Sequence, residues 1–221
     1  MLKKHWWKAL AVMLIFYTII GGLILEVPRL AILNETIRNL YFHVPMWFVM
    51  VITAGTSAFY AIRYLNKQNP IDDTRSLEFA KAGILFGVLG MLSGMLWAQF
   101  TWGTFWSGDP KQNASAVAIM IYFGYLILRG AFTDELQKFR VSAVYNILAY
   151  AVYIPLIFIL PRLTDSLHPG NGGNPGFNAY DLDSKLRLVF YPAVIGWILV
   201  GVWVAQLRIR LTKAEIIIEN K

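Results

Sequence analysis

Two of the three histidines in this chain stand where they could act as ligands, at the ends of long apolar segments. His43 lies in YFHVPMW and His168 in DSLHPG, each close to a proline, whereas His5 follows two N-terminal lysines and is expected to be a solvated interfacial residue. Imidazole is a borderline-soft ligand that suits iron and other transition metals. His43 and His168 are therefore the first candidates for binding chemistry, although either one alone is equally compatible with an amphipathic surface residue.

A stretch dense in aromatic residues separates these two histidines in the sequence. Residues 97–112, WAQFTWGTFWSGDPKQ, contain Trp97, Trp102 and Trp106 together with two phenylalanines. Tryptophan gathers at membrane interfaces, but three so close together exceed the needs of an ordinary aromatic belt. Two imidazoles can cap both faces of a haem, and flat aromatic rings pack against a porphyrin. The residues therefore indicate a haem site, with an interfacial belt as the alternative.

Several local signals predict how helices start and pack around this stretch. Asp109, Pro110 and Gln112 have the types and spacing of a capping box, so capping is the main role expected of Asp109. Pro45 is expected in the first turn of a helix, which leaves His43 near that helix's N-terminus. A glycine face predicts close helix packing, or else a smooth surface for a flat ligand or partner helix. Its members are Gly83, Gly87, Gly90 and Gly94.

The elements that must position these residues are membrane-spanning helices. The 221 residues are 57% hydrophobic, with a mean hydropathy of +0.51, outside the usual range of soluble proteins. A span needs about 20 largely apolar residues. We predict an all-α integral membrane protein with six transmembrane helices in a single polytopic domain, residues 1–221, and we expect Pro155 and Pro192 to bend the last two helices. The predicted spans are at about 7–25, 45–63, 82–101, 113–129, 141–160 and 188–207.

Basic residues predict the orientation of the spans. If both termini are cytoplasmic, the cytoplasmic segments hold fourteen of the 20 lysines and arginines and the opposite side holds six. The positive-inside rule therefore places both termini in the cytoplasm. The net charge of +7 then reflects membrane topology, and no nucleic acid partner is expected.

The three connections on the outer side differ from ordinary turns. In residues 27–42 one helical face is apolar, which predicts a helix lying in the membrane interface, and its members are Leu30, Leu33, Ile37 and Leu40. Residues 100–112 form an outer-face tryptophan-rich loop, and residues 161–187 contain a run of turn formers too long for a mere connection. Both candidate histidines fall on this side, so binding chemistry is expected there.

The residues that the sequence lacks exclude several function classes. Without cysteine there is no thiolate metal site, no thiol nucleophile and no covalent Cys-x-x-Cys-His haem attachment. No phosphate-binding P-loop is present, so the chain is not its own ATPase. No predicted span carries an acidic residue or a histidine in its middle, which argues against an ion-coupled transporter and against a cytochrome b with haem inside the bundle. We expect a carrier rather than an enzyme.

The motif and its flanking histidines match a known family. WGTFWSGDPK resembles the tryptophan-rich WGxxWxWD signature of haem-handling proteins in cytochrome c maturation, and HVP and LHPG are similar to the external histidine pair of that family. Six spans in a chain of this length look like the CcmC type, the C component of the haem exporter, rather than its larger synthetase-type or lyase-type relatives. The resemblance covers nearly the whole chain.

The resemblance implies a set of site residues. His43 and His168 match the axial ligands of the iron. The residues that fall on the motif are Trp102, Gly103, Trp106 and Asp109. Gly108 stands where the pattern usually has its last tryptophan, which removes one wall of the aromatic surface. The haem propionates need cations, for which the outer basic residues are candidates, Lys111 and Arg162 first and then Lys185, Arg187, Arg29 and Arg38.

The resemblance also implies a function and partners. The chain would bind b-type haem non-covalently and transiently at the periplasmic side of the bacterial inner membrane and pass it to a periplasmic haem chaperone. The permease and ATPase subunits of the exporter, and a small membrane subunit, would be its partners. Ligation needs neutral imidazoles, so haem binding is expected to weaken as the pH falls through the histidine range.

Other functions also fit parts of the sequence. A redox membrane anchor would pass electrons between quinol and a partner, with haem or quinone deeper in the bundle. A permease for a small apolar solute would use the aromatic residues as a gate, although the spans hold few polar residues. A subunit that only binds other proteins would explain the glycine face but not the outer histidines.

Overall fold

The computed structural model describes residues 2–29, 32–168 and 182–219. In these residues six helices are long and apolar enough to cross a membrane, and no β-strand is present. Each predicted span corresponds to one of them, so the all-helical fold and the number of spans are confirmed. The helices are α1 (Leu2–Ile24), α2 (Leu40–Lys67), α3 (Pro70–Trp102), α4 (Pro110–Gly130), α5 (Glu135–Ile154) and α6 (Ser184–Glu219).

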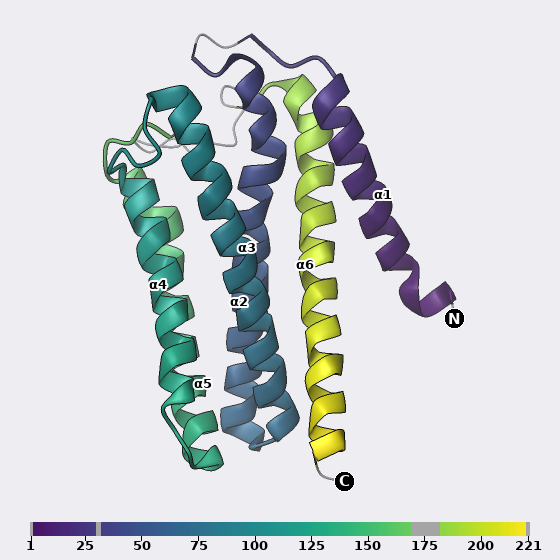
Figure 1. Cartoon of the computed structure of the whole chain (residues 1–221), viewed down its shortest axis with the longest axis vertical. Coiled ribbons are helices and arrows are strands. Elements are labelled where there is room, and N and C mark those ends of the chain that lie inside the picture. The colour runs from purple at the N-terminus through teal and green to yellow at the C-terminus, as the bar shows by residue number, and fades with distance from the viewer. Residues whose placement is uncertain (1, 30–31, 169–181, 220–221) are drawn as a thin grey trace.

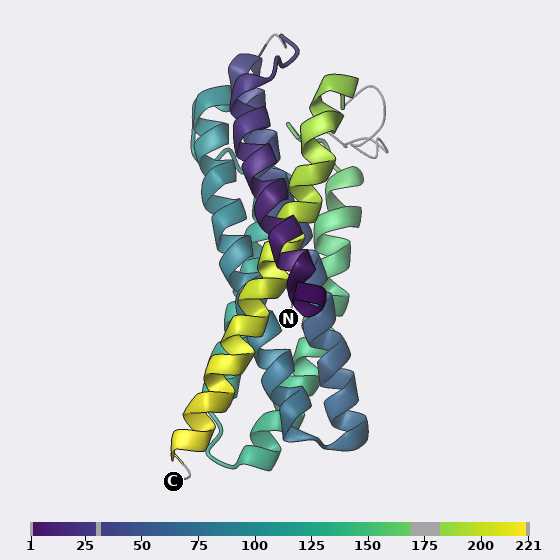
Figure 2. The ribbon, with the colours of Figure 1, turned by 90° about the vertical axis from the view of Figure 1, so that its right-hand side faces the viewer.

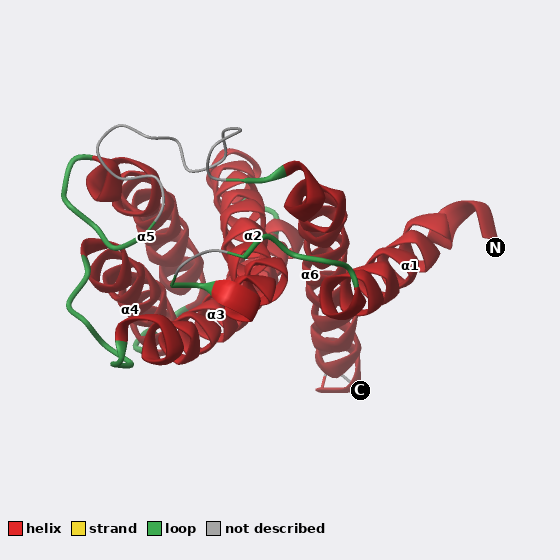
Figure 3. Ribbon diagram, turned by 90° about the horizontal axis from the view of Figure 1, so that it is seen from above, coloured by secondary structure: helices red, strands yellow, loops and turns green. Residues whose placement is uncertain are grey.

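The six helices form an elongated bundle with α2, α3 and α6 in its middle (Figure 1). Helices α4 and α5 pack beside α2 and α3 on one side, and α1 lies against the other side of α6, leaning away from the bundle (Figure 3). One end of the bundle carries the α1–α2, α3–α4 and α5–α6 connections, and we call it the site end. The opposite end carries the two short turns between helices and the C-terminus (Figure 2).

The glycine face of α3 packs directly on α2. A Cβ added at Gly87 would lie 2.5 Å from Met50 Sδ, and one added at Gly94 would lie 2.5 Å from His43 Cε1. Real Cβ atoms do not approach other atoms so closely, so these positions need glycine for the two backbones to meet. The expectation of close helix packing is confirmed, and the partner of this face is α2 rather than a flat ligand.

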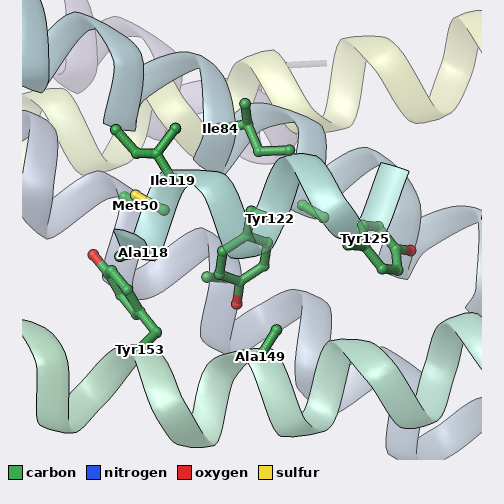
Figure 4. Packing of buried hydrophobic residues seen from close by; sticks show 10 residues of the cluster. Met50, Ile84, Ala118, Ile119, Tyr122, Tyr125, Ala149 and Tyr153 are labelled. Carbon is green, nitrogen blue, oxygen red and sulfur yellow. The ribbon is translucent and has the colours of Figure 1, made fainter. Parts of the chain in front are cut away.

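A cluster of aromatic and aliphatic side chains fills the space between α4, α5 and the central helices (Figure 4). Tyr122 and Tyr153 are fully buried, with ring centroids 6.1 Å apart in an edge-to-face arrangement, and Met50 and Ile119 pack against them. Such pairs contribute about 0.5–1.5 kcal/mol beyond the area that they bury. This packing fixes α4 relative to α2 and therefore supports the start of α4 at the site end.

Buried ion pairs hold the opposite end of the bundle together. Three acidic residues in the first turns of α3 are buried, and all three have basic partners: Asp72, Asp73 and Glu78. Asp73 forms a bidentate pair with Arg129 of α4, in which Nη1 donates to Oδ1 at 2.8 Å. Glu78 accepts from Arg208 of α6 at 2.7 Å. These residues precede the predicted span at 82–101, so they do not contradict the expectation that no span carries an acidic residue in its middle.

Two expectations about the connection between α1 and α2 are wrong. Residues 27–42 do not form one interfacial helix: in the described part of the connection between α1 and α2, the helical segment is a short 3-10 helix, Asn34–Asn39, which continues directly into α2. Pro28 cannot donate a backbone hydrogen bond and favours an extended Val27, and Ile37 is buried against α6 instead of facing lipid. Leu30 lies outside the described residues. Since α2 begins at Leu40, Pro45 lies in its second turn rather than its first.

The two prolines expected to bend helices differ in their surroundings. Helix α5 ends at Ile154, and a π-helical segment, Pro155–Ile159, followed by a 3-10 turn, Leu160–Arg162, leads the chain away. Proline removes a backbone donor, so a change of helix type at Pro155 has a direct cause. Pro192 lies inside α6, whose helical pattern continues through it.

Candidate functional site

His43 lies in the first turn of α2, at the site end, and is almost completely buried. Its Nδ1 lies 2.9 Å from the Gly90 carbonyl oxygen and 3.2 Å from Ser93 Oγ on α3. A carbonyl oxygen can only accept, so Nδ1 carries the proton and donates to Gly90. The neutral ring therefore keeps its lone pair on Nε2, the nitrogen that remains for a metal.

Two tryptophans stand edge-on to this imidazole. The ring centroids of Trp97 and Trp47 lie 5.9 and 6.5 Å from that of His43, with interplanar angles of 75° and 80°. Trp97 is itself fixed, because its Nε1 donates to Thr36 Oγ1 at 3.1 Å. The ring of His43 is therefore held from three sides, by the α3 backbone and by two indoles.

His168 is the second imidazole at the site end, and its environment is different. Its side chain is 24% exposed, and its Nδ1 lies 2.9 Å from Asp109 Oδ1. An ionised carboxylate can only accept, so Nδ1 is again the protonated nitrogen and Nε2 again the one that remains. The ring centroid of Trp102 lies 4.8 Å away at an interplanar angle of 77°. His168 is thus oriented by a carboxylate and an indole.

Asp109 is the centre of a network of hydrogen bonds that the sequence did not reveal. Its buried carboxylate accepts from the backbone N–H of Lys111 at 2.8 Å, which caps α4, and from the N–H of Leu167 at 2.7 Å. It also accepts from Ser166 Oγ and from the ring of His168. Burial opposes the ionised form, but the hydrogen bonds from His168, Leu167 and Ser166 outweigh it and lower the pKa of Asp109. The carboxylate is therefore ionised at neutral pH.

The capping box is present only in part. Asp109 caps α4 as expected, but the amide of Gln112 does not return to the Asp109 backbone. Its Oε1 accepts instead from the N–H of Ser107 at 2.9 Å, and its Nε2 donates to the Phe105 carbonyl oxygen at 3.3 Å. Gln112 is buried, and it holds the tryptophan loop against α4. Ser166 is a supporting residue that the sequence did not reveal, although the Ser-x-His spacing of residues 166–168 was an available signal, and Gln112 was expected only in the capping box.

Glycines set the path of the tryptophan loop. Helix α3 ends at Trp102, and Gly103 follows with a φ of +78°. Gly108 has a φ of +74°, and nothing lies within 4 Å of a Cβ added there. A tryptophan at 108 would have to adopt a left-handed backbone, which L-residues with bulky side chains avoid. The departure from the motif at Gly108 therefore has a backbone cause, and the turn that it allows brings Asp109 to His168.

The structure brings the two histidines to the same end of the bundle. Trp97 and Trp102, which contact one histidine each, are five residues apart on α3, or about 7.5 Å along its axis. Trp106 is 40% exposed beyond the end of α3 and contacts neither imidazole in the described residues. Trp102, Asp109 and His168 thus form one cluster, and His43 lies with Trp97 at the same end of the bundle.

The outer basic residues differ in how they are engaged. Lys111 follows Asp109 by two residues, and Arg162 ends the 3-10 turn that leads to Ser166. Both lie on the chain segments that hold His168, and both interact with other groups. Arg38 donates to the carbonyl oxygens of Gly22 and Leu25 at the end of α1. Other candidates are engaged away from the cluster or exposed: Lys185 with Glu26, Arg187 with the Leu182 carbonyl, and Arg29 at the surface.

The described residues contain no group of three or more histidine, aspartate or glutamate side chains that could hold a bare metal ion. Two imidazoles fall short of the three or four protein ligands of usual zinc sites. Iron in a porphyrin already has four equatorial nitrogens and needs only axial ligands. The donor set therefore suits haem better than an isolated ion.

Comparisons with known proteins agree with this chemistry. The family model described as "Heme exporter protein C", CcmC, matches residues 2–220. A protein of that name from Bradyrhizobium diazoefficiens is 22% identical over 83% of this chain and 70% of its own length. Those of Haemophilus influenzae and Escherichia coli K12 are each 23% identical over 80% of this chain, covering 72% and 70% of their own lengths. The chain belongs to the heme exporter protein C family, CcmC.

Proposed function

We propose that this protein binds haem at the periplasmic face of the bacterial inner membrane, through His43 and His168, and delivers it for the assembly of c-type cytochromes. The observation that carries the proposal is shared by the two histidines. Each ring has its Nδ1 hydrogen bonded to an acceptor that cannot donate, Gly90 O or Asp109 Oδ1, so each presents Nε2 as a ligand. Family membership and the names of the relatives support haem as the cargo.

The orientation of the protein follows from its basic residues, as the positive-inside rule predicts. With both termini in the cytoplasm, the site end faces the periplasm. The whole chain, residues 1–221, acts as one polytopic unit whose helices hold the site at the membrane surface. Haem is largely apolar, so it can lie beside the exposed aromatic rings of Phe105 and Trp106, which are 51% and 40% exposed.

The two ligands have unequal mobility in this proposal. His43 is fixed on a helix between α3 and two indoles, whereas His168 is held through Asp109 on a connection at the surface. His43 keeps the iron while His168 lets go, which leaves one axial position for the periplasmic chaperone. Lys111 and Arg162 stand on the His168 side, where they can neutralise the propionates during this exchange.

The partners proposed for delivery are the periplasmic haem chaperone, the permease and ATPase subunits of the exporter, and a small membrane subunit. The haem is b-type, held without a covalent bond and only transiently. The chain makes no covalent bond itself, so we propose a binding and delivery role rather than an enzymatic one.

The test is the absorption spectrum of the detergent-purified protein, with a pyridine haemochrome assay, produced with ample haem. The wild-type protein should show a Soret band, and the single variants His43→Ala and His168→Ala should lose most of the bound haem while keeping their helical circular dichroism. The variant His5→Ala is a matched control, because His5 lies near the start of α1, away from the site end, and it should retain haem as the wild type does. Unchanged haem content in both site variants would refute the proposal.

A further inference from the structure

A second cluster of basic side chains lies away from the site end, between the beginning of α1 and the second half of α6. It surrounds a pocket of about 360 Å³ that is lined by His5, Lys8, Trp203, Gln206, Leu207 and Arg210. Helix α1 meets α6 at Gly196, where an added Cβ would lie 3.0 Å from Leu14 Cβ, and it leans away from the bundle towards its N-terminus (Figure 1). The pocket is separate from the haem-binding cluster, whose residues come from α2, α3 and the connections at the site end.

The positive charge of this pocket is not neutralised within the described residues. His5, Lys8 and Arg210 form no ion pair there, whereas Arg208, two residues from Arg210, is paired with Glu78. Lys8 Nζ lies 5.1 Å from the ring centroid of Trp203 and 5.6 Å from that of Trp7. Stacking over two rings fixes the ammonium group without removing its charge. The pocket is therefore preorganised for an anion.

The floor of the pocket also contains a hydrogen-bond donor that lacks an acceptor. Trp203 Nε1 is buried and has no partner among the described residues. Buried N–H groups almost always have an acceptor, and leaving one unpaired is unfavourable. A ligand with several oxygen atoms would supply it. Charge and hydrogen bonding thus both favour a phosphate group.

The depth of the pocket identifies the source of that phosphate. Lys8 precedes the end of α1 at Ile24 by 16 residues, about 24 Å, and Trp203 follows the start of α6 at Ser184 by 19 residues, about 28 Å. The hydrocarbon core of a bilayer is about 30 Å thick. Measured from the site end, the pocket therefore lies at the far membrane interface, where lipid headgroups are found. The neighbouring face of α1 is apolar and exposed, with Met13 and Phe16 about 60% accessible.

We propose that this pocket binds the headgroup phosphate of an anionic phospholipid, whose acyl chains run along the exposed face of α1. With both termini in the cytoplasm, the lipid belongs to the inner leaflet. The bound headgroup bridges Lys8 on α1 and Arg210 on α6, and so ties the leaning helix to the bundle. This role does not depend on haem binding.

The test compares lipid retention by two double variants of the full-length protein. Lys8→Gln with Arg210→Gln removes two charges from the pocket, and Lys67→Gln with Arg140→Gln removes the same two residue types near the short turns between helices, outside the pocket. Native mass spectrometry would follow the uptake of phosphatidylglycerol and of zwitterionic phosphatidylcholine. The pocket variant should lose affinity for phosphatidylglycerol roughly 10- to 30-fold and the control less than about twofold. Equal losses in the two variants would overturn the proposal.

Two further measurements separate this site from its alternatives. Trp203→Phe keeps the ring and removes only the N–H, and it should weaken phosphatidylglycerol binding by roughly 2- to 5-fold. Inorganic phosphate at millimolar concentration should not displace the lipid; displacement would assign the pocket to a soluble anion instead. Haem content should be unchanged in every pocket variant, so a failure of the haem proposal would be recognised separately.

Discussion

Replacing Asp109 by asparagine tests how the site holds its exposed histidine. Asparagine is as good a helix cap as aspartate, so the bond from the Lys111 N–H and the start of α4 should survive. Its single amide oxygen can take the place of Oδ1, which accepts from Lys111 and His168, and the amide NH2 group then replaces Oδ2, the acceptor of the Leu167 N–H. The variant therefore loses the bond from Leu167 and the negative charge opposite the Nδ1–H of His168, which turns a charge-assisted hydrogen bond into a neutral one.

The magnitude follows from the role of such a partner. Removing a group that orients a metal-binding histidine typically lowers metal affinity by about 10- to 100-fold, which corresponds to about 1.4–2.8 kcal/mol. We expect Asp109→Asn to fall in this range for haem, and Asp109→Ala to lose in addition about 0.5–2 kcal/mol of stability through the missing cap. His43 has its own acceptor at Gly90, so a weaker, single-histidine complex should remain.

The assay is a haem titration of the purified apoprotein, followed by the Soret band. The matched control is Asp134→Asn, because Asp134 caps α5 at the opposite end through a single bond to the Gln137 N–H at 2.7 Å. The control should bind haem within about twofold of the wild type. If Asp109→Asn also binds haem like the wild type, Asp109 is only a helix cap, and the assignment of His168 as a carboxylate-oriented ligand is refuted.

Three more predictions concern packing, the far end and pH. Gly94→Ala should push the ring of His43 aside, destabilising the fold by about 1–3 kcal/mol and lowering haem occupancy, as measured by thermal unfolding and pyridine haemochrome. Arg129→Ala should destabilise the protein by about 3–5 kcal/mol without changing the haem spectrum, because it leaves the buried Asp73 unpaired. The pKa of Asp109 is lowered in the folded protein. The ionised carboxylate therefore contributes fully to stability above the ordinary pKa of 3.8, and this contribution is lost only as the pH falls through the lowered pKa of the folded state. The backbone N–H of Leu167 donates to this carboxylate. Its protection from hydrogen exchange, corrected for intrinsic exchange rates, should therefore be equal at pH 7 and pH 5.

The sequence predicted the helices well because the bilayer imposes one strong requirement. About 20 apolar residues are needed to cross it, and six such blocks are separated by polar turns. The apolar pattern does not show how far the helices extend beyond the hydrocarbon core. The first turns of α3 are an example, because they are polar and contain Asp73 and Glu78, which pair with basic residues. The pattern also failed at residues 27–42, where an apolar face indicated lipid contact but Ile37 packs on another helix.

The sequence suggested candidate residues for the site but not the hydrogen bonds that join them. Histidine, tryptophan and aspartate at fixed positions in a motif indicate chemistry, but hydrogen bonds between residues far apart in sequence leave no local pattern. The sequence indicated a helix cap at Asp109 because its bond to Lys111 is local. Its bond to His168 joins residues 59 positions apart and leaves no such pattern. The acceptor for His43 is a backbone carbonyl of Gly90, which has no side chain to signal the role.

The packing of α1 has a consequence for how the protein is made. Helix α1 is synthesised before the other five helices, yet its main packing partner is α6, which is synthesised after them. Until then its inner face must lie against lipid, which an apolar helix tolerates because acyl chains are as apolar as its neighbours. Arg38, which donates to the carbonyl oxygens of Gly22 and Leu25, ties the end of α1 to the start of α2 early in synthesis. A nascent chain stalled before residue 184 would therefore carry a membrane-inserted but undocked first helix, a form that quality-control proteases can distinguish from the finished protein.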